Sequence, residues 1–202
     1  MQRKTFDILV SAGALLLVAV LAVAGGLLTW GSSYINNQVH SQLAAQKITF
    51  PPQSAFAAAK VGTEITPSMI PSVSKYAGQQ LVTGQQAEAY ADHFIAVHLQ
   101  EIGGGKTYAQ LSTEAQAQPN NTALANQVAT VFKGTTLRSM LLTAYGFSTM
   151  GRIAGDGANV AFGGAAGLLV LAGFGFYHGR KVPASAEVLA HQAHLESEKV
   201  NS

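Results

Sequence analysis

The chain of 202 residues contains no cysteine and has few charged residues for its length. Without cysteine it forms no disulfide, has no thiol nucleophile and offers no thiolate to a metal. Lys, Arg, Asp and Glu together make up 11% of the residues, and the formal net charge is +2. Because the Lys and Arg residues do not cluster into a basic surface, we expect no nucleic-acid partner.

The charged residues are absent from two long apolar stretches, residues 8–28 and 160–177. A helix needs roughly 20 apolar residues to cross a bilayer, so we predict transmembrane helices at 8–30 and 157–178. A cleaved signal peptide is the alternative for the first stretch, but signal cores usually span only about 7–15 residues. The predicted fold class is therefore an all-α membrane protein, with two transmembrane helices and a small helical extracytoplasmic domain between them.

Basic residues flank both stretches on their outer sides. Arg3 and Lys4 precede the first, and Arg180 and Lys181 follow the second. Basic residues next to a span tend to stay in the cytoplasm. We therefore predict a plasma-membrane protein with a cytoplasmic N-terminus (1–7), an extracytoplasmic domain (31–156) and a cytoplasmic tail (179–202), in contact with membrane lipid.

The region between the spans has the sequence features of helices. Residues 34–46 continue the first helix, and Pro51-Pro52 ends it. Thr83 and Gln86 form a capping-box pattern, and Gly103 is a C-cap, which together predict a helix at 84–102.

Three more helices are predicted after this one: a short one at 108–116, one that begins at Asn121 or Thr122, and an apolar one at 137–153. We expect Gly155-Asp156-Gly157 to break the last of these before the second span.

Two patterns suggest chemistry but have the wrong spacing for it. The run from Gly103 to Thr107 resembles a phosphate-binding loop, yet Gln100 stands where the Walker pattern requires glycine, so a helix C-cap and turn is favoured. His93 and His98 are five residues apart, which places them about 140° apart on a regular helix, too far to share an ion. We expect no catalytic residue, no metal and no cofactor.

Small residues recur within both predicted spans. Gly163 and Gly167 form a GxxxG pair, and Ala22 and Gly26 form a second small-residue pair. Such pairs let helix backbones approach closely in lipid, either between these two spans or against another membrane subunit, although glycine is also common in membrane helices without a specific contact. We predict a partner contact at these four positions and at the apolar residues Met140, Leu141, Tyr145 and Phe147.

The chain also resembles a family of small two-span actinobacterial membrane proteins of unknown function, some of them labelled aromatic ring-opening dioxygenase. The resemblance covers roughly residues 47–177 and rests on GQQAEAYADHFIAVHLQEIGGGKTYAQLSTEAQAQPNN and VFKGTTLRSMLLTAYGFSTMG. An iron dioxygenase of this kind requires two histidines and a carboxylate, for which His93, His98 and Glu101 are the nearby candidates. In size and layout the chain is similar, more weakly, to accessory subunits of actinobacterial respiratory supercomplexes, which implies docking without a cofactor of its own.

Three functions follow as hypotheses. The favoured one is a non-catalytic accessory or scaffold subunit that docks on larger integral membrane subunits through its spans and external helices. The second is an iron-dependent ring-opening dioxygenase. The third is an extracytoplasmic module that binds a lipid or a small ligand.

Overall fold

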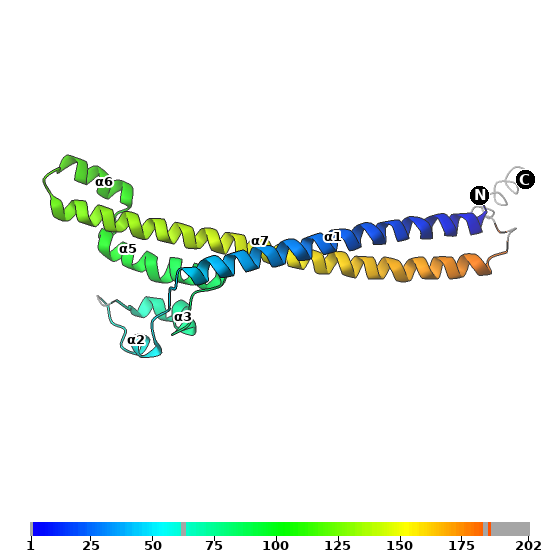
Figure 1. Cartoon of the computed structure of the whole chain (residues 1–202), viewed down its shortest axis with the longest axis horizontal. Coiled ribbons are helices and arrows are strands. Elements are labelled where there is room, and N and C mark those ends of the chain that lie inside the picture. The colour runs from blue at the N-terminus through cyan, green and yellow to red at the C-terminus, as the bar shows by residue number, and fades with distance from the viewer. Residues whose placement is uncertain (1, 62–63, 184–185, 187–202) are drawn as a thin grey trace, which may run out of the picture. The chain divides into compact units, whose positions relative to one another are not determined.

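The computed structural model describes residues 2–61, 64–183 and 186, and within these every regular element is a helix (Figure 1). An isolated antiparallel bridge joins Thr49 and Gln80. In chain order the elements are α1 (Arg3–Ala45), α2 (Gln53–Ala57), η1 (Pro67–Met69), α3 (Ile70–Val73), η2 (Ser74–Tyr76), α4 (Gly84–Tyr90), η3 (Ala91–Ile95), α5 (Ala96–Gly103), α6 (Tyr108–Ala117) and α7 (Thr122–Lys181).

Two of these helices, α1 and α7, are long and apolar enough to cross a membrane. The predictions of an all-helical chain with two such helices are therefore confirmed. The residues divide into two compact units, which we call the span unit (Met1–Gly31 and Ala154–Ser202) and the central unit (Ser32–Ile153). Most of the predicted tail, 179–202, lies outside the described residues.

The prediction of a helix break at Gly155-Asp156-Gly157 is wrong, because α7 continues through these residues without interruption. A glycine inside a helix costs only about 1 kcal/mol relative to alanine and, unlike proline, keeps its backbone N–H. Within the span unit, Gly157 faces Leu28, and a Cβ at this position would lie 3.5 Å from Leu28 Cδ1. Packing against α1 thus offsets the weak helix propensity.

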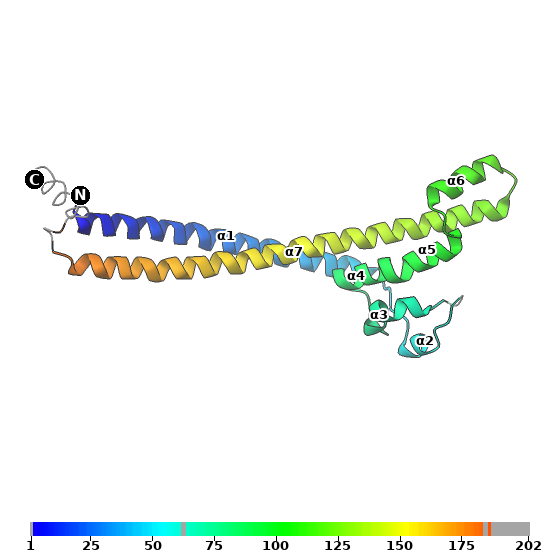
Figure 2. The same cartoon turned by 180° about the vertical axis from the view of Figure 1, so that it is seen from behind.

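In the span unit α1 and α7 run antiparallel and side by side, as both views show (Figure 1; Figure 2). Small residues of α7 are buried along this contact: Ala158, Ala161, Ala165 and Ala172. On α1, Gly25 lies against the Phe162 ring, so close that a Cβ there would be 2.9 Å from ring carbons. A hydrogen bond of 3.0 Å between Asp7 Oδ2 and His178 Nδ1 joins the two helices near their outer ends.

In the central unit the short helices pack around a core that both long helices help to build. Phe50, Met69 and Leu81 are fully buried there, and α1 contributes Val39 and Leu43 while α7 contributes Leu141. A smaller cluster joins Leu111 of α6 to Leu124 and Val131 of α7. The central unit thus has a hydrophobic core of its own. The bounds of this unit, Ser32–Ile153, are close to the limits 31–156 expected for the domain between the spans.

The helix predicted at 84–102 is present but is not regular. Its capping box is confirmed: Thr83 Oγ1 accepts a hydrogen bond from Gln86 N, and Gln86 Oε1 accepts one from Thr83 N. The segment Ala91–Ile95 is a π-helical turn, η3, which the sequence analysis did not predict. The helix ends at Gly103, and Gly104, with φ 58°, is the left-handed C-cap, one residue later than predicted.

Candidate functional site

One face of α7 in the span unit is open. A Cβ built on Gly163 or Gly167 would meet no atom within 4 Å, and Val160, Val170 and Phe174 are exposed beside them. At 100° per residue these five residues fall within about 80° of one another. We call them the open glycine face.

The buried face of α7 points the other way. Ala158, Ala161, Ala165 and Ala172, which pack on α1, lie roughly opposite the open glycine face when the same helical rotation is applied. Gly163 and Gly167 therefore do not mediate the contact between the two long helices. Contact with another membrane subunit therefore stays a prediction for this pair.

The small-residue pair of α1 is also turned outward. Ala22 is exposed, and a Cβ on Gly26 would have no neighbour within 4 Å. Gly25, the adjacent residue, is the one buried against α7 through Phe162. The sequence identified the right kind of residue in this span but not the helix face that makes the contact.

The four contact residues predicted at 137–153 differ widely in exposure. Leu141 is only 3% exposed and belongs to the core, and Tyr145 is half-buried beside Gly84. Met140 and Phe147 are exposed, at 65% and 52%. Only these last two offer their side chains freely to another molecule.

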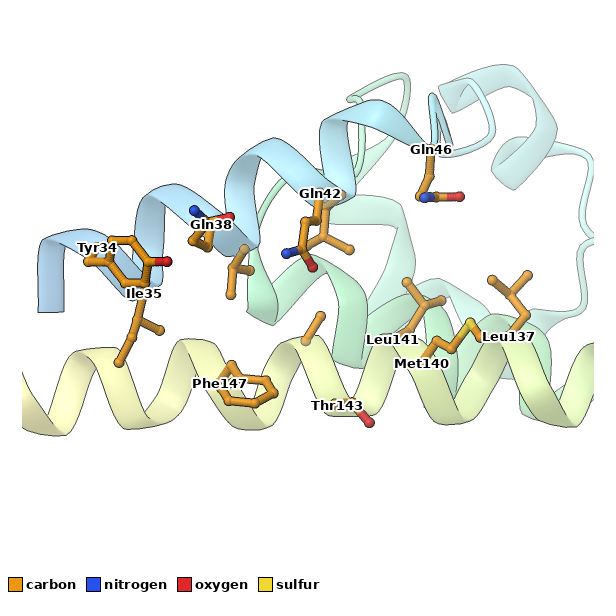
Figure 3. Close-up of a pocket in the computed structure, with 13 residues that line it drawn as sticks. Tyr34, Ile35, Gln38, Gln42, Gln46, Leu137, Met140, Leu141, Thr143 and Phe147 are labelled. Atoms are coloured by element: carbon orange, nitrogen blue, oxygen red, sulfur yellow. The ribbon is translucent and has the colours of Figure 1, made fainter. Parts of the chain in front are cut away.

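Met140, Leu141 and Phe147 line a groove of about 520 Å³ in the central unit. The opposite wall is formed by α1, with three glutamines, Gln38, Gln42 and Gln46, along it (Figure 3). Their spacing of four residues places them on one side of the helix. Sequence analysis missed the groove, because the glutamine spacing gains meaning only once α7 is known to lie opposite.

The histidines considered for iron lie on α5 and the π-helical turn before it. His98 Nδ1 is 2.8 Å from the Phe94 carbonyl oxygen, and its ring packs on the Phe94 ring. The 140° separation of His93 from His98 does not hold, because it assumed a regular helix where η3 is present. Among the residues that the structure describes, no group of three or more His, Asp or Glu is placed to hold a metal ion.

A row of aromatic rings in contact runs from Phe50 through Tyr90 at the end of α4 to Phe94 in η3. Tyr90 contacts Phe50 at 5.3 Å and Phe94 at 4.6 Å between ring centroids. Burial raises the pKa of the Tyr90 hydroxyl, and the negative charge of Glu64 raises it further. Next to this row, Asp92 pairs with Arg138 and so links the π-helical turn to α7. The aromatic contacts and the Asp92–Arg138 pair therefore hold the helices of the central unit together.

Comparison of the chain with protein-family models, with curated proteins and with solved structures returns no match. The open glycine face and the groove are therefore the two candidate functional surfaces of the protein.

Proposed function

We propose that this protein is a non-catalytic accessory subunit of a membrane complex. It spans the plasma membrane twice, with both termini in the cytoplasm and residues 31–156 outside, and it docks on a larger integral membrane protein through the open glycine face. A respiratory supercomplex of the kind suggested by the resemblance is one such complex. The protein supplies packing surface rather than chemistry.

The observation that carries this proposal is the position of Gly163 and Gly167. They lie away from α1, and no atom lies within 4 Å of the Cβ positions that another residue would occupy there. In lipid there is no hydrophobic drive between helices, so association depends on close packing, which small residues allow. A backbone surface without side chains, flanked by Val160, Val170 and Phe174, suits a second membrane helix.

Ring opening by non-haem iron has less support. It requires two histidines and a carboxylate that converge on one point. Within the described part of the chain, His93, His98 and Glu101 do not belong to any group of three or more side chains placed to hold a metal ion. We therefore do not propose this activity.

Purification in a mild detergent, followed by mass spectrometry, tests the docking proposal. We expect a membrane protein to co-purify in a fixed ratio with the wild-type chain and to be lost from the double variant Gly163→Leu/Gly167→Leu. Gly173→Leu is the matched control, because Gly173 is also on α7 with no atom within 4 Å of its Cβ position. Recovery of the wild-type chain alone, or equal recovery of the partner by both variants, would contradict the proposal.

A further inference from the structure

The groove of the central unit is a second surface, which docking through the spans does not use. Its lining residues are apolar or uncharged polar: neither Asp, Glu, Lys, Arg nor His is among the described residues that form it. A charged ligand would lose hydration there without gaining a counter-charge, which is costly. The groove therefore favours an uncharged ligand.

The two walls of the groove offer different chemistry. On α7 the wall is apolar, with Met140, Leu141 and Phe147. On α1, Gln42 directs its amide group toward α7, and Gln38 lies on the same wall one turn earlier (Figure 3). An amide both donates and accepts hydrogen bonds, so it matches hydroxyl groups and ester carbonyls. The complementary ligand has an apolar tail and an uncharged head with hydroxyl or ester oxygens.

Size and location narrow the class of ligand. The groove's volume of about 520 Å³ falls within the usual range for small-molecule sites, about 300–1,000 Å³. A whole helix, which is about 10–12 Å across with its side chains, is too large for such a site. Tyr34, the first lining residue, follows the apolar stretch that ends at Leu28 by six residues of α1. Six helical residues rise by about 9 Å, so the groove begins close to where α1 leaves the hydrocarbon core.

We infer that this groove binds a membrane lipid with an uncharged head group, and that one acyl chain lies against Met140, Leu141 and Phe147. The hydroxyl or ester oxygens of the head bind the amide of Gln42. This inference depends on the proposed membrane anchoring, because α1 must bring the groove to the bilayer surface. It does not depend on which protein docks on the open glycine face.

Native mass spectrometry of the purified full chain, held in amphipol and free of detergent, tests the inference with monooleoylglycerol as the probe. We expect saturable binding of one probe molecule per chain. Oleate has the same chain with a charged carboxylate, and it should bind at least tenfold more weakly. Gln42→Trp, which fills the groove, and Met140→Glu, which places a charge on its apolar wall, should each weaken probe binding at least tenfold.

His40→Trp is the matched control, because His40 is an exposed α1 residue that does not line the groove. It should bind the probe like the wild type. Absence of saturable binding, or unchanged binding by both groove variants, would overturn the inference. Partner co-purification is expected to be normal in Gln42→Trp, so failure of the lipid site and failure of the docking proposal are distinguishable.

Discussion

At the residue scale, the tightest constraint in the central unit is the approach of α4 to α7 at Gly84. A Cβ on Gly84 would overlap the Ser148 side chain and lie 3.3 Å from the Tyr145 Cα atom. Rotation about χ1 of Ser148 would move its Oγ but not its Cβ, which the added atom would overlap, and the backbone of α7 cannot move without disturbing the core around Leu141. Glycine is therefore required here for space rather than for backbone conformation.

We predict that Gly84→Ala lowers the free energy of unfolding of the central unit by about 1–3 kcal/mol, the usual cost of overpacking. Gly146→Ala is the control, since a Cβ there meets no atom within 4 Å. It should be neutral or stabilise by up to about 1 kcal/mol through helix propensity. Denaturant unfolding followed by circular dichroism measures both, and equal stability of the two variants would contradict the close approach.

Tyr90 makes stability depend on pH in the alkaline range. Its folded-state pKa is raised above the ordinary value of 10.0, so the unfolded chain loses the hydroxyl proton first as the pH rises. Stability is fully present below pH 10 and falls as the pH rises through the folded-state pKa. In Tyr90→Phe this loss should be smaller, which melting temperatures between pH 8 and pH 11 would reveal. Parallel curves for the variant and the wild type would refute it.

At the element scale, the two capping boxes differ in burial and therefore in energetic weight. Gln86 at the start of α4 is 5% exposed, and its Oε1 accepts hydrogen bonds from the backbone N–H groups of Val82 and Thr83. Gln110 plays the same part at the start of α6, where it is exposed and water can replace it. The two capping boxes thus share a sequence pattern, but Gln86 of the first is buried in the protein and Gln110 of the second is exposed to solvent.

Gln86→Leu should therefore destabilise the central unit more than Gln110→Leu does. The first leaves two partly buried N–H groups without an acceptor, at about 1–3 kcal/mol for each buried unpaired group, and the second should cost at most about 1 kcal/mol. Unfolding midpoints of the two variants in the same detergent decide the point. A larger loss for Gln110→Leu would show that burial is not what separates the boxes.

The success of sequence analysis also varies by element. The sequence alone predicted where α4 begins, at Thr83, and where α7 begins, after Asn121. Both helix starts are capped by residues that are neighbours in the chain, so a local pattern is enough to identify them. The π-helical turn at Ala91–Ile95 and the continuity of α7 through Gly157 depend on packing between distant segments, which no local pattern encodes. For the same reason the open glycine face was predicted by residue type, but its direction away from α1 was not.

At the scale of the whole molecule, the proposed topology places the two termini on one side of the membrane and the central unit on the other. The absence of cysteine makes this testable, because each introduced thiol is then the only one in the chain. Thr113 in α6 and Gln2 near the N-terminus are both exposed. They provide one reporter for each side.

Thr113→Cys should react with a membrane-impermeant maleimide in intact cells. Gln2→Cys should react only after the membrane is permeabilised, because the proposed topology puts this end, with Arg3 and Lys4, in the cytoplasm. The reverse pattern would invert the proposed topology, and reaction of both in intact cells would contradict two membrane crossings.

The central claim is that the open glycine face of α7 contacts a larger membrane protein, and site-specific photocrosslinking in cells tests it most directly. Val170 and Leu169 are neighbours on α7 with similar exposure, 58% and 53%, but about 100° of helix rotation separates them, and only Val170 belongs to the open glycine face. A photoreactive residue at position 170 should give a discrete adduct with one larger membrane protein, and the same residue at position 169 should give little or none. Equal adducts from both positions, or lipid adducts alone from position 170, would contradict the account.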